Sequence, residues 1–410
     1  MDNNTKKNVI WNMIGTTANA FNSLFFMIIV TRINGLKDSG IFTLAFSLAC
    51  LFCFIGNYEG RVFQVTDVKA DFSNKEYIVH RISSCILMMT IVVLYCLVMK
   101  YDFYKMSVTL ALCFMKCCEV FSDVFYGILQ KNDNLQQVGK SLFIKSIASI
   151  VIFIVLDLIT KNLLLSCLGL DLIWLVILFL YDIPKTKQHI NSTEEIRVSN
   201  IVKLYKDGFF SFSILFLGVY LVNAQKYALD GVIVESLQAI FGIVLMPATI
   251  ISLACQYLLQ PILNTIANLY ALGKKKEFNV LIFKSSLLVL VFGFACVIGA
   301  YLLGIPVLNI LYGVDISNYK LCLILIIVGA VFYSLSTLIS AALTTIRHTF
   351  VQFIVYSITS LFALFVSRWF IIQLSLIGAS LAYLLCMFMQ FLLYLLIYVF
   401  VMRKQEFKEV

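Results

Sequence analysis

The sequence predicts an all-α polytopic membrane protein with two groups of six transmembrane helices on either side of a polar linker. Hydrophobic residues make up 61% of the chain and charged residues 13%, against roughly 45–50% and about 25% in soluble domains. Apolar runs of membrane-spanning length recur along the chain, and a polar stretch at 181–207 divides them into two halves. In bilayer hydrocarbon every backbone polar group needs a partner within its own segment, so runs of about 20 apolar residues must be helices.

The elements follow from the positions of the apolar runs. In the first half, helices are expected at residues 8–31, 40–63, 82–99, 106–129, 142–160 and 163–181. In the second half, they are expected at residues 208–229, 232–263, 280–303, 321–345, 351–366 and 374–402. The predicted domains are an N-terminal six-helix bundle (1–181), a linker (182–206) and a C-terminal six-helix bundle (207–410). Because each bundle holds an even number of helices, the two are parallel repeats, expected to enclose a central cavity.

The distribution of Lys and Arg predicts the orientation in the membrane. With a cytoplasmic N-terminus, the cytoplasmic loops hold roughly 20 Lys and Arg residues against 8 in the outer loops, as the positive-inside rule requires. Both termini and the linker are therefore predicted to be cytoplasmic. The same rule explains the net charge of +9 without a nucleic-acid partner. The outer loops are too short for a catalytic domain.

The sequence predicts no metal site and no cofactor. All twelve cysteines lie inside apolar runs, where a thiol behaves as a small hydrophobic group. Cys50 and Cys53 form a lone C-x-x-C without a second pair, and the three histidines fall in or beside loops. No nucleotide-binding G-x-x-x-x-G-K-[ST] motif is present.

The fourth predicted helix carries the densest set of intramembrane charges. Lys116, Glu119 and Asp123 are spaced by three and four residues and so share one face, which Tyr126 continues. Charges near a helix centre cost about 2.5–3.5 kcal/mol on insertion scales, so they usually face a cavity or a partner. One interpretation is a self-neutralising pair of Lys116 with Glu119. The other is a functional face, because Asp123 is left needing a partner or a proton.

Two further cations lie near predicted cytoplasmic helix ends. Arg61 follows Glu59 near the end of the second helix, and Gly56 and Gly60, which can loosen the backbone, lie just before it. Lys145 is expected one turn into the fifth helix. Each is a candidate for the cavity, and each is equally explained by a side chain that snorkels to the interface.

The second half offers a candidate gate and a candidate hinge. Lys226 and Asp230 lie around the outer turn after the seventh helix, where an ion pair and an ordinary solvated loop are both consistent with the sequence. Pro247 lies inside the eighth helix, where a proline removes a backbone hydrogen bond and favours a kink.

Several segments resemble bacterial polysaccharide flippases of the Wzx type, within the superfamily of multidrug extruders, oligosaccharidyl-lipid flippases and polysaccharide exporters. The resemblance lies in RVFQVTD (61–67), DVFYGILQKNDNLQQVGKSL (123–142), VNAQKYALD (222–230) and QAIFGIVLMPATIISLACQYLLQPIL (238–263). Helix number and the central break agree with it. Two positions depart from the family pattern, since Gln225 stands where proline is expected and Gln260 where arginine is expected.

The resemblance implies a fold like that of the MATE extruders and a non-enzymatic function. The implied substrate is an undecaprenyl-diphosphate-linked oligosaccharide repeat unit, moved by alternating access to the outer leaflet of the bacterial cytoplasmic membrane for capsule or O-antigen assembly. Arg61, Lys116 and Lys145 are the candidates for binding the diphosphate, because a compact anion leaving water needs cationic partners. Glu119 and Asp123 are the candidates for ion coupling. Membrane lipid, a polysaccharide polymerase and a chain-length regulator are the implied partners.

Three other functions remain open at this point. A small-molecule extruder for organic cations would favour acids without cations in its cavity. A membrane polymerase or sugar transferase would require a large outer loop with acids, Arg or His. A scaffold of polysaccharide assembly would tolerate neutralisation of its intramembrane charges.

Overall fold

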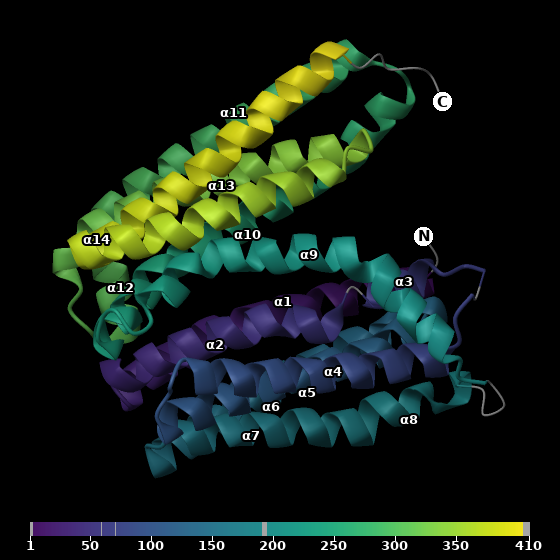
Figure 1. The fold of residues 1–410 in the computed structure, drawn as a ribbon, viewed down its shortest axis with the longest axis horizontal. Coiled ribbons are helices and arrows are strands. Elements are labelled where there is room, and N and C mark those ends of the chain that lie inside the picture. The colour runs from purple at the N-terminus through teal and green to yellow at the C-terminus, as the bar shows by residue number, and fades with distance from the viewer. Residues whose placement is uncertain (1–2, 59, 70, 191–194, 405–410) are drawn as a thin grey trace. The chain divides into compact units, whose positions relative to one another are not determined.

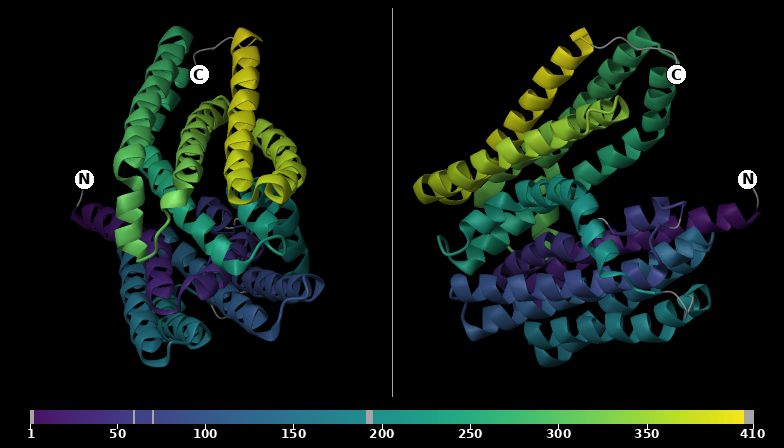
Figure 2. Two further views of the ribbon diagram at one scale, coloured as in Figure 1. Left: turned by 90° about the vertical axis from the view of Figure 1, so that its left-hand side faces the viewer. Right: turned by 45° about the vertical axis from the view of Figure 1, so that its right-hand side comes forward.

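The structure is a computed structural model that describes residues 3–58, 60–69, 71–190 and 195–404 (Figure 1). Every regular element in these ranges is a helix, and the long helices of each half run side by side (Figures 1 and 2). The predicted all-α class is therefore confirmed. The chain divides into two compact units, unit 1 at residues 1–216 and unit 2 at residues 217–410. The finer domain limits given above stay a prediction.

Unit 1 is built around α5, which contacts α2, α3, α4, α6 and α7. Its elements are α1 (Asn3–Ile33), α2 (Leu36–Asn57), α3 (Gly60–Thr66), α4 (Asn74–Val98), α5 (Phe103–Lys131), α6 (Leu135–Thr160), α7 (Leu163–Ile177), η1 (Leu178–Asp182), α8 (Ile183–Thr186) and η2 (Lys187–His189). The next helix, α9 (Val198–Leu229), begins in unit 1 and ends in unit 2.

Unit 2 is built around α13, which contacts α10, α11 and α14. Its other elements are α10 (Glu235–Ala271), α11 (Lys275–Gly299), η3 (Ala300–Gly304), α12 (Ile305–Tyr312), η4 (Ser317–Tyr319), α13 (Lys320–Thr345) and α14 (Phe350–Lys404). The 55 residues of α14 are two helices joined at Ser375, whose φ of 53° interrupts the helical backbone. The two arms approach closely there: a Cβ added at Gly378 would lie 2.0 Å from the Phe370 carbonyl oxygen. Only a residue without a side chain fits at this position.

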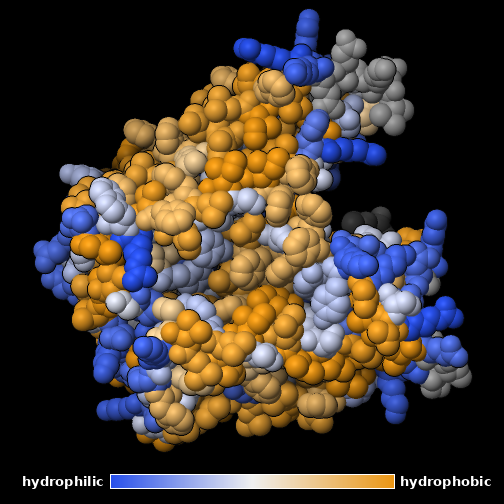
Figure 3. Space-filling model, viewed as in Figure 1, coloured by the Kyte–Doolittle hydropathy of each residue, from blue (hydrophilic) through white to orange (hydrophobic). Residues whose placement is uncertain are grey.

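The helices have the length and hydropathy of membrane spans. Among the described residues, ten helices are long and apolar enough to cross a membrane. On the face drawn in Figure 3, hydrophobic residues cover much of the helices and hydrophilic residues gather near helix ends. The protein is therefore a multi-pass membrane protein, while the count of twelve spans stays a prediction.

Two close contacts show how sequence sets the packing of unit 1. Gly15 on α1 and Gly139 on α6 face each other, and a Cβ added at Gly15 would lie 2.2 Å from the Gly139 carbonyl oxygen. Small residues let helix backbones approach closely where apolar burial gives no advantage over lipid. At the start of α4, Ser73 and Glu76 form a capping box. Glu76 Oε1 also accepts from the Arg197 amide (3.0 Å) and the Asn200 side chain (2.9 Å), which ties α4 to the start of α9.

Two short π-helical segments interrupt long helices. Each directly precedes an Ile-Pro pair: η1 lies before Ile183–Pro184, and η3 lies before Ile305–Pro306. Proline lacks an amide hydrogen and its ring crowds the preceding turn, so a wider turn just before it relieves the clash. The consequence in unit 1 is the position of Asp182, the last residue of η1.

Candidate functional site

A polar cavity of about 220 Å³ lies within unit 1. It is bounded by residues of α1, α2, α3, α5 and α6, among them Asn19, Asn57, Arg61, Glu119, Asp123 and Tyr126. Two of the predicted acids and one of the predicted cations therefore line the same cavity. Lys116 and Lys145 are close to it through the contacts described below.

The break between α2 and α3 positions Arg61. Tyr58 adopts a left-handed conformation with φ 42°, which ends α2, and α3 begins two residues later. From α3, Arg61 Nη1 forms an ion pair with Asp123 Oδ1 at 3.1 Å. Arg61 Nε and Nη2 both donate to Gln130 Oε1, at 3.1 and 2.9 Å. The Arg61 side chain keeps 26% of its surface exposed, so it is both oriented and accessible.

Arg81, which lies behind Asp123, was not predicted as a site residue. Its Nη2 is 3.7 Å from Asp123 Oδ2, and its Nη1 donates to the Gly56 carbonyl (3.0 Å) and to Asn57 Oδ1 (2.8 Å). Only 1% of its side chain is exposed. Asp123 therefore has two arginine partners, Arg61 and Arg81, which supply the partner that the sequence left it needing.

The sequence did contain a signal for Arg81. The hydropathy window started the third membrane helix at residue 82, which placed Arg81 in a loop. The S-x-x-E capping box at Ser73 and Glu76 is a helix-start signal, and α4 in fact begins at Asn74. Arg81 is thus inside the helix and faces the protein interior.

Lys116 and Glu119 form the ion pair that their spacing predicted. Lys116 Nζ lies 2.6 Å from Glu119 Oε2, and Asn19 on α1 donates to Glu119 Oε1 at 3.1 Å. In this cluster, Arg61, Arg81 and Lys116 face the two carboxylates of Glu119 and Asp123. One positive charge is in excess, which favours an anionic ligand.

Lys145 is the centre of a second, fully buried network. Its Nζ lies 2.5 Å from Asp182 Oδ2 and donates to Ser122 Oγ (2.6 Å) and Tyr126 OH (3.0 Å). Ser141 donates to the other Asp182 oxygen at 2.6 Å, and both Lys145 and Asp182 are 0% exposed. Tyr126 also lines the cavity, and its ring centre is 5.9 Å from the Arg61 guanidinium. Tyr126 therefore connects the buried network to the cavity.

The position of Lys145 differs from the expectation. The helix that carries it begins at Leu135 rather than at residue 142, so Lys145 lies well inside α6 and does not snorkel. Its partner Asp182 was assigned to the linker, because the apolar run ends at residue 181. In the structure the helix continues through η1 into α8, so Asp182 lies within it. No sequence motif indicates which carboxylate pairs with Lys145.

The remaining predicted residues lie elsewhere. Lys226 is in the last turn of α9, and Asp230 is buried in the turn that follows. Pro247 lies inside α10, which continues past it as a helix to Ala271. Their roles as gate and hinge stay predictions, and Glu59 falls outside the described residues.

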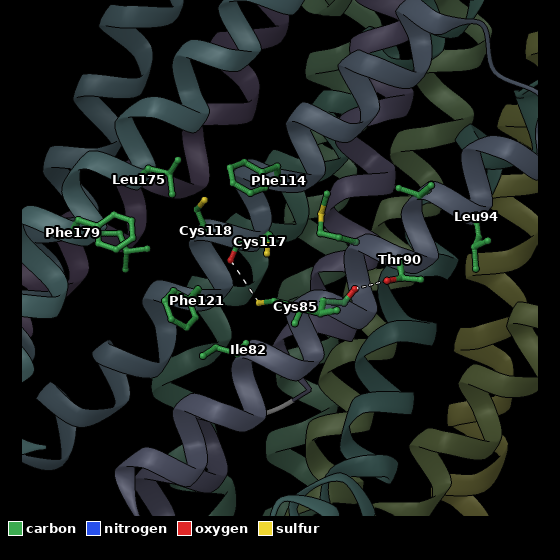
Figure 4. Close-up of a pocket in the computed structure, with 14 residues that line it drawn as sticks. Ile82, Cys85, Thr90, Leu94, Phe114, Cys117, Cys118, Phe121, Leu175 and Phe179 are labelled. Carbon is green, nitrogen blue, oxygen red and sulfur yellow. Dashed lines mark hydrogen bonds between the residues drawn. The ribbon is translucent and has the colours of Figure 1, made fainter. Parts of the chain in front are cut away.

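A larger hollow in unit 1, of about 670 Å³, is almost entirely apolar (Figure 4). Its walls come from α4, α5, α7 and the start of η1, with Phe114, Cys117, Cys118 and Phe121 projecting from α5. These residues occupy the face of α5 opposite to Glu119 and Asp123. Inside it the Cys85 thiol donates to the Cys117 carbonyl at 3.9 Å. An apolar lining of this kind suits contact with hydrocarbon rather than with a charged ligand.

No metal-binding group of three or more His, Cys, Asp or Glu residues occurs in the part of the chain that the structure describes.

Comparisons with known proteins add to this geometry. No protein-family model matches the chain. The chain is 24% identical over 334 residues to the capsular polysaccharide biosynthesis protein CapF of Staphylococcus aureus, a match that covers 80% of this chain and 82% of that protein. The structure is similar to the lipid II flippase MurJ in an inward closed conformation, with a TM-score of 0.70, 16% identity, and coverage of 94% of this chain and 87% of that one.

A mutant form of the MATE transporter VcmN of Vibrio cholerae matches with a TM-score of 0.63 and 11% identity over 98% of this chain and 99% of that one. The chain has the MATE–MurJ transporter fold. The resemblance to polysaccharide flippases of this superfamily, predicted from the sequence, is confirmed. The two solved structures are named as a flippase and a transporter, and the likeness to them establishes the fold.

Proposed function

We propose that this protein is a flippase that moves undecaprenyl-diphosphate-linked oligosaccharide repeat units from the cytoplasmic to the outer leaflet of a bacterial cytoplasmic membrane, for capsule or surface polysaccharide assembly. The observation that carries the proposal is the excess positive charge around the unit 1 cavity, with Arg61 partly exposed within it. Similarity to a capsular polysaccharide biosynthesis protein supports a role in the synthesis of a surface polysaccharide. Both termini are proposed to be cytoplasmic, with polymerase and chain-length regulator as partners.

Arg61 is the proposed first contact of the diphosphate. Guanidinium groups bind phosphate oxygens through paired N–H donors. The ion pair of Arg61 with Asp123 keeps the cation oriented while the site is empty, and Arg81 can hold Asp123 when Arg61 turns to the ligand. Lys116 is the proposed second cation. Lys145, buried against Asp182, is proposed to orient Tyr126 in the cavity wall.

Glu119 and Asp123 are the proposed coupling groups. Each shares its charge with a cation that the substrate would compete for, so substrate binding and carboxylate protonation are expected to be linked. Lys226 with Asp230 as a gate and Pro247 as a hinge belong to the same proposal.

Complementation tests the function. Wild type, Arg61→Ala, Lys116→Ala and a Glu119→Gln, Asp123→Asn double variant are expressed in a host that lacks its flippase and carries the matching sugar pathway. The wild type is expected to restore surface polysaccharide. Arg61→Ala is expected to lower export by roughly tenfold to a hundredfold, since hydrogen bonds to charged groups contribute about 1.5–3 kcal/mol, while lipid-linked repeat units accumulate in the inner leaflet.

Lys284→Ala is the matched control, because Lys284 is an exposed cation on α11, outside the cavity. Its export is expected to equal that of the wild type at equal protein level. No rescue by the wild type would contradict the flippase function. Full rescue by Arg61→Ala and Lys116→Ala would keep the flippase and discard this diphosphate site.

A further inference from the structure

Unit 2 contains a second cavity, of about 210 Å³, with a different chemistry. Residues of α9, α10, α13 and the second arm of α14 line it, and its polar lining includes Thr249, Ser252, Gln256, Tyr333, Thr337 and Tyr383. Among the described residues that line it, none is charged. The cavity thus offers hydroxyl, amide and aromatic groups only.

Several of these polar groups are available to a ligand. Ser252 and Thr337 donate to carbonyls of their own helices, at 2.8 Å each, and so present oxygen lone pairs as acceptors. Within the described part of the chain, the side chains of Thr249 and Gln256 make no hydrogen bond, and both are exposed. An amide has two donors and an acceptor, and leaving it bare in hydrocarbon is unfavourable. This face of α10 therefore requires water or a polar ligand.

Two tyrosines supply aromatic surface beside these groups. Tyr383 is 1% exposed overall and its ring packs on α13 at Gly329, where an added Cβ would lie 2.7 Å from the ring. Tyr333, one turn further along α13, is only half-buried and lines the same cavity. A flat ring can stack on the C–H face of another ring while its hydroxyl stays near polar groups.

The lining excludes most ligand classes. A phosphate needs a cation, and an organic or inorganic cation that leaves water needs a carboxylate or similar counter-charge. The cavity supplies neither. A neutral ring with several hydroxyl groups on its edge and C–H groups on its face matches both the polar amide and hydroxyl groups and the aromatic surface. The volume is below the roughly 300–1,000 Å³ of drug-sized sites, which suits a single ring.

We propose that this cavity binds one neutral sugar ring, an inference that rests on the proposed function in taking the ring from the lipid-linked oligosaccharide. Gln256 and Thr249 hydrogen-bond the hydroxyl groups of the ring, and Tyr333 stacks on its face. The site recognises the sugar without contacting the diphosphate. It therefore determines which repeat units are accepted, whereas the charged cavity of unit 1 recognises what all of them share.

Saturation-transfer NMR on the purified full-length protein tests the site. The probes are methyl glycosides of glucose, galactose, mannose, N-acetylglucosamine and N-acetylgalactosamine, with myo-inositol as the non-sugar polyol control. At least one glycoside is expected to bind more strongly than myo-inositol. Gln256→Leu and Tyr333→Leu are expected to weaken that binding by roughly threefold to tenfold, the range of one neutral hydrogen bond or one ring contact.

Further variants and ions separate this site from glycoside binding elsewhere on the protein. Gln225→Leu removes another glutamine of unit 2 that does not line the cavity, and its binding is expected to match the wild type. Binding of no glycoside above myo-inositol, or binding unchanged in Gln256→Leu and Tyr333→Leu, overturns the proposal. Stabilisation by sodium over potassium that the same two variants abolish would identify a cation site and also overturn it.

The outcomes also separate the site from the flippase function. A wild type that binds a glycoside in the Gln256-dependent way but restores no export refutes the flippase and leaves the sugar site standing. A wild type that restores export while no glycoside binds refutes the sugar site alone.

Discussion

Unit 1 and unit 2 each contain a polar cavity, of about 220 and 210 Å³ respectively. The two cavities differ in the charge of the side chains that line them. The unit 1 cavity is lined by Arg61, Glu119 and Asp123, and the buried Lys145–Asp182 ion pair is linked to it through Tyr126. The unit 2 cavity is lined by neutral side chains throughout the described residues. Charged polar groups thus line the cavity of one unit, and neutral polar groups line the cavity of the other.

The two π-helical segments show the same difference on a smaller scale. Both precede an Ile-Pro pair, so both have one local cause. Two residues before the proline, unit 1 has Asp182, which meets Lys145, whereas unit 2 has Gly304. The π-helical turn before the proline positions the buried Asp182 carboxylate in unit 1. In unit 2 the corresponding turn carries Gly304 and positions no charge. Fold and site chemistry are therefore set by different residues.

The largest expected effect comes from removing Lys145. Lys145→Ala leaves Asp182 buried without its cation, and breaking a buried ion pair on one side costs about 3–5 kcal/mol. We expect the free energy of unfolding to fall by this amount in detergent. Trp174 fluorescence is a local reporter, because its ring centre lies 4.6 Å from Lys145 Nζ.

Two further variants test whether this loss is specific to the charge. Lys145→Met with Asp182→Leu replaces both partners by apolar groups and is expected to recover most of the stability. Gln225→Leu removes a buried polar side chain of unit 2, whose amide nitrogen has a weak 3.4 Å contact with Ser367, and should change stability by less than about 1 kcal/mol. An equal loss in Gln225→Leu and Lys145→Ala would end the distinction between the units.

The sequence predicted the membrane fold well and the site only in part. Hydropathy located the long helices because their apolar length is a property of consecutive residues, and helical spacing identified the Lys116–Glu119 pair for the same reason. The pairing of Asp123 with Arg81, and of Lys145 with Asp182, joins residues on different helices. Such pairs depend on how helices are rotated against each other, which one sequence does not record. The neutral cavity of unit 2 was missed because its polar residues are uncharged and come from different helices, and although Thr249, Ser252 and Gln256 lie in the quoted 238–263 segment, that segment does not single them out.

An intermediate effect is expected from adding a methyl group beside Arg81. A Cβ at Gly60 would lie 2.6 Å from Arg81 Nη2, so Gly60→Ala must displace a guanidinium that is held by Asp123 and the end of α2. Overpacking of this kind costs about 1–3 kcal/mol. A lower melting temperature and lower export in the complementation assay are the expected results.

The matched change in unit 2 is Gly299→Ala on α11, where nothing lies within 4 Å of the added Cβ. It is expected to be neutral or stabilising, since alanine favours a helix over glycine by about 0.8–1.0 kcal/mol. If both variants lose stability equally, the effect belongs to helical glycines in general rather than to the arginine cluster.

The smallest expected effect separates the two cavities by ligand. Inorganic pyrophosphate, as a probe of the diphosphate, should raise the melting temperature of the wild type slightly, because a ligand at a concentration equal to its Kd stabilises by only about 0.4 kcal/mol. Arg61→Gln should lose this shift, since Arg61 is a partly exposed cation that lines the unit 1 cavity. Gln256→Leu should retain it, because the amide that it removes lines only the neutral cavity. A shift that both variants abolish would mean that one anion site depends on both units, and one that both retain would place the anion outside either cavity. Only the reciprocal pattern, with pyrophosphate dependent on Arg61 and glycoside dependent on Gln256, supports the division of recognition between the two units.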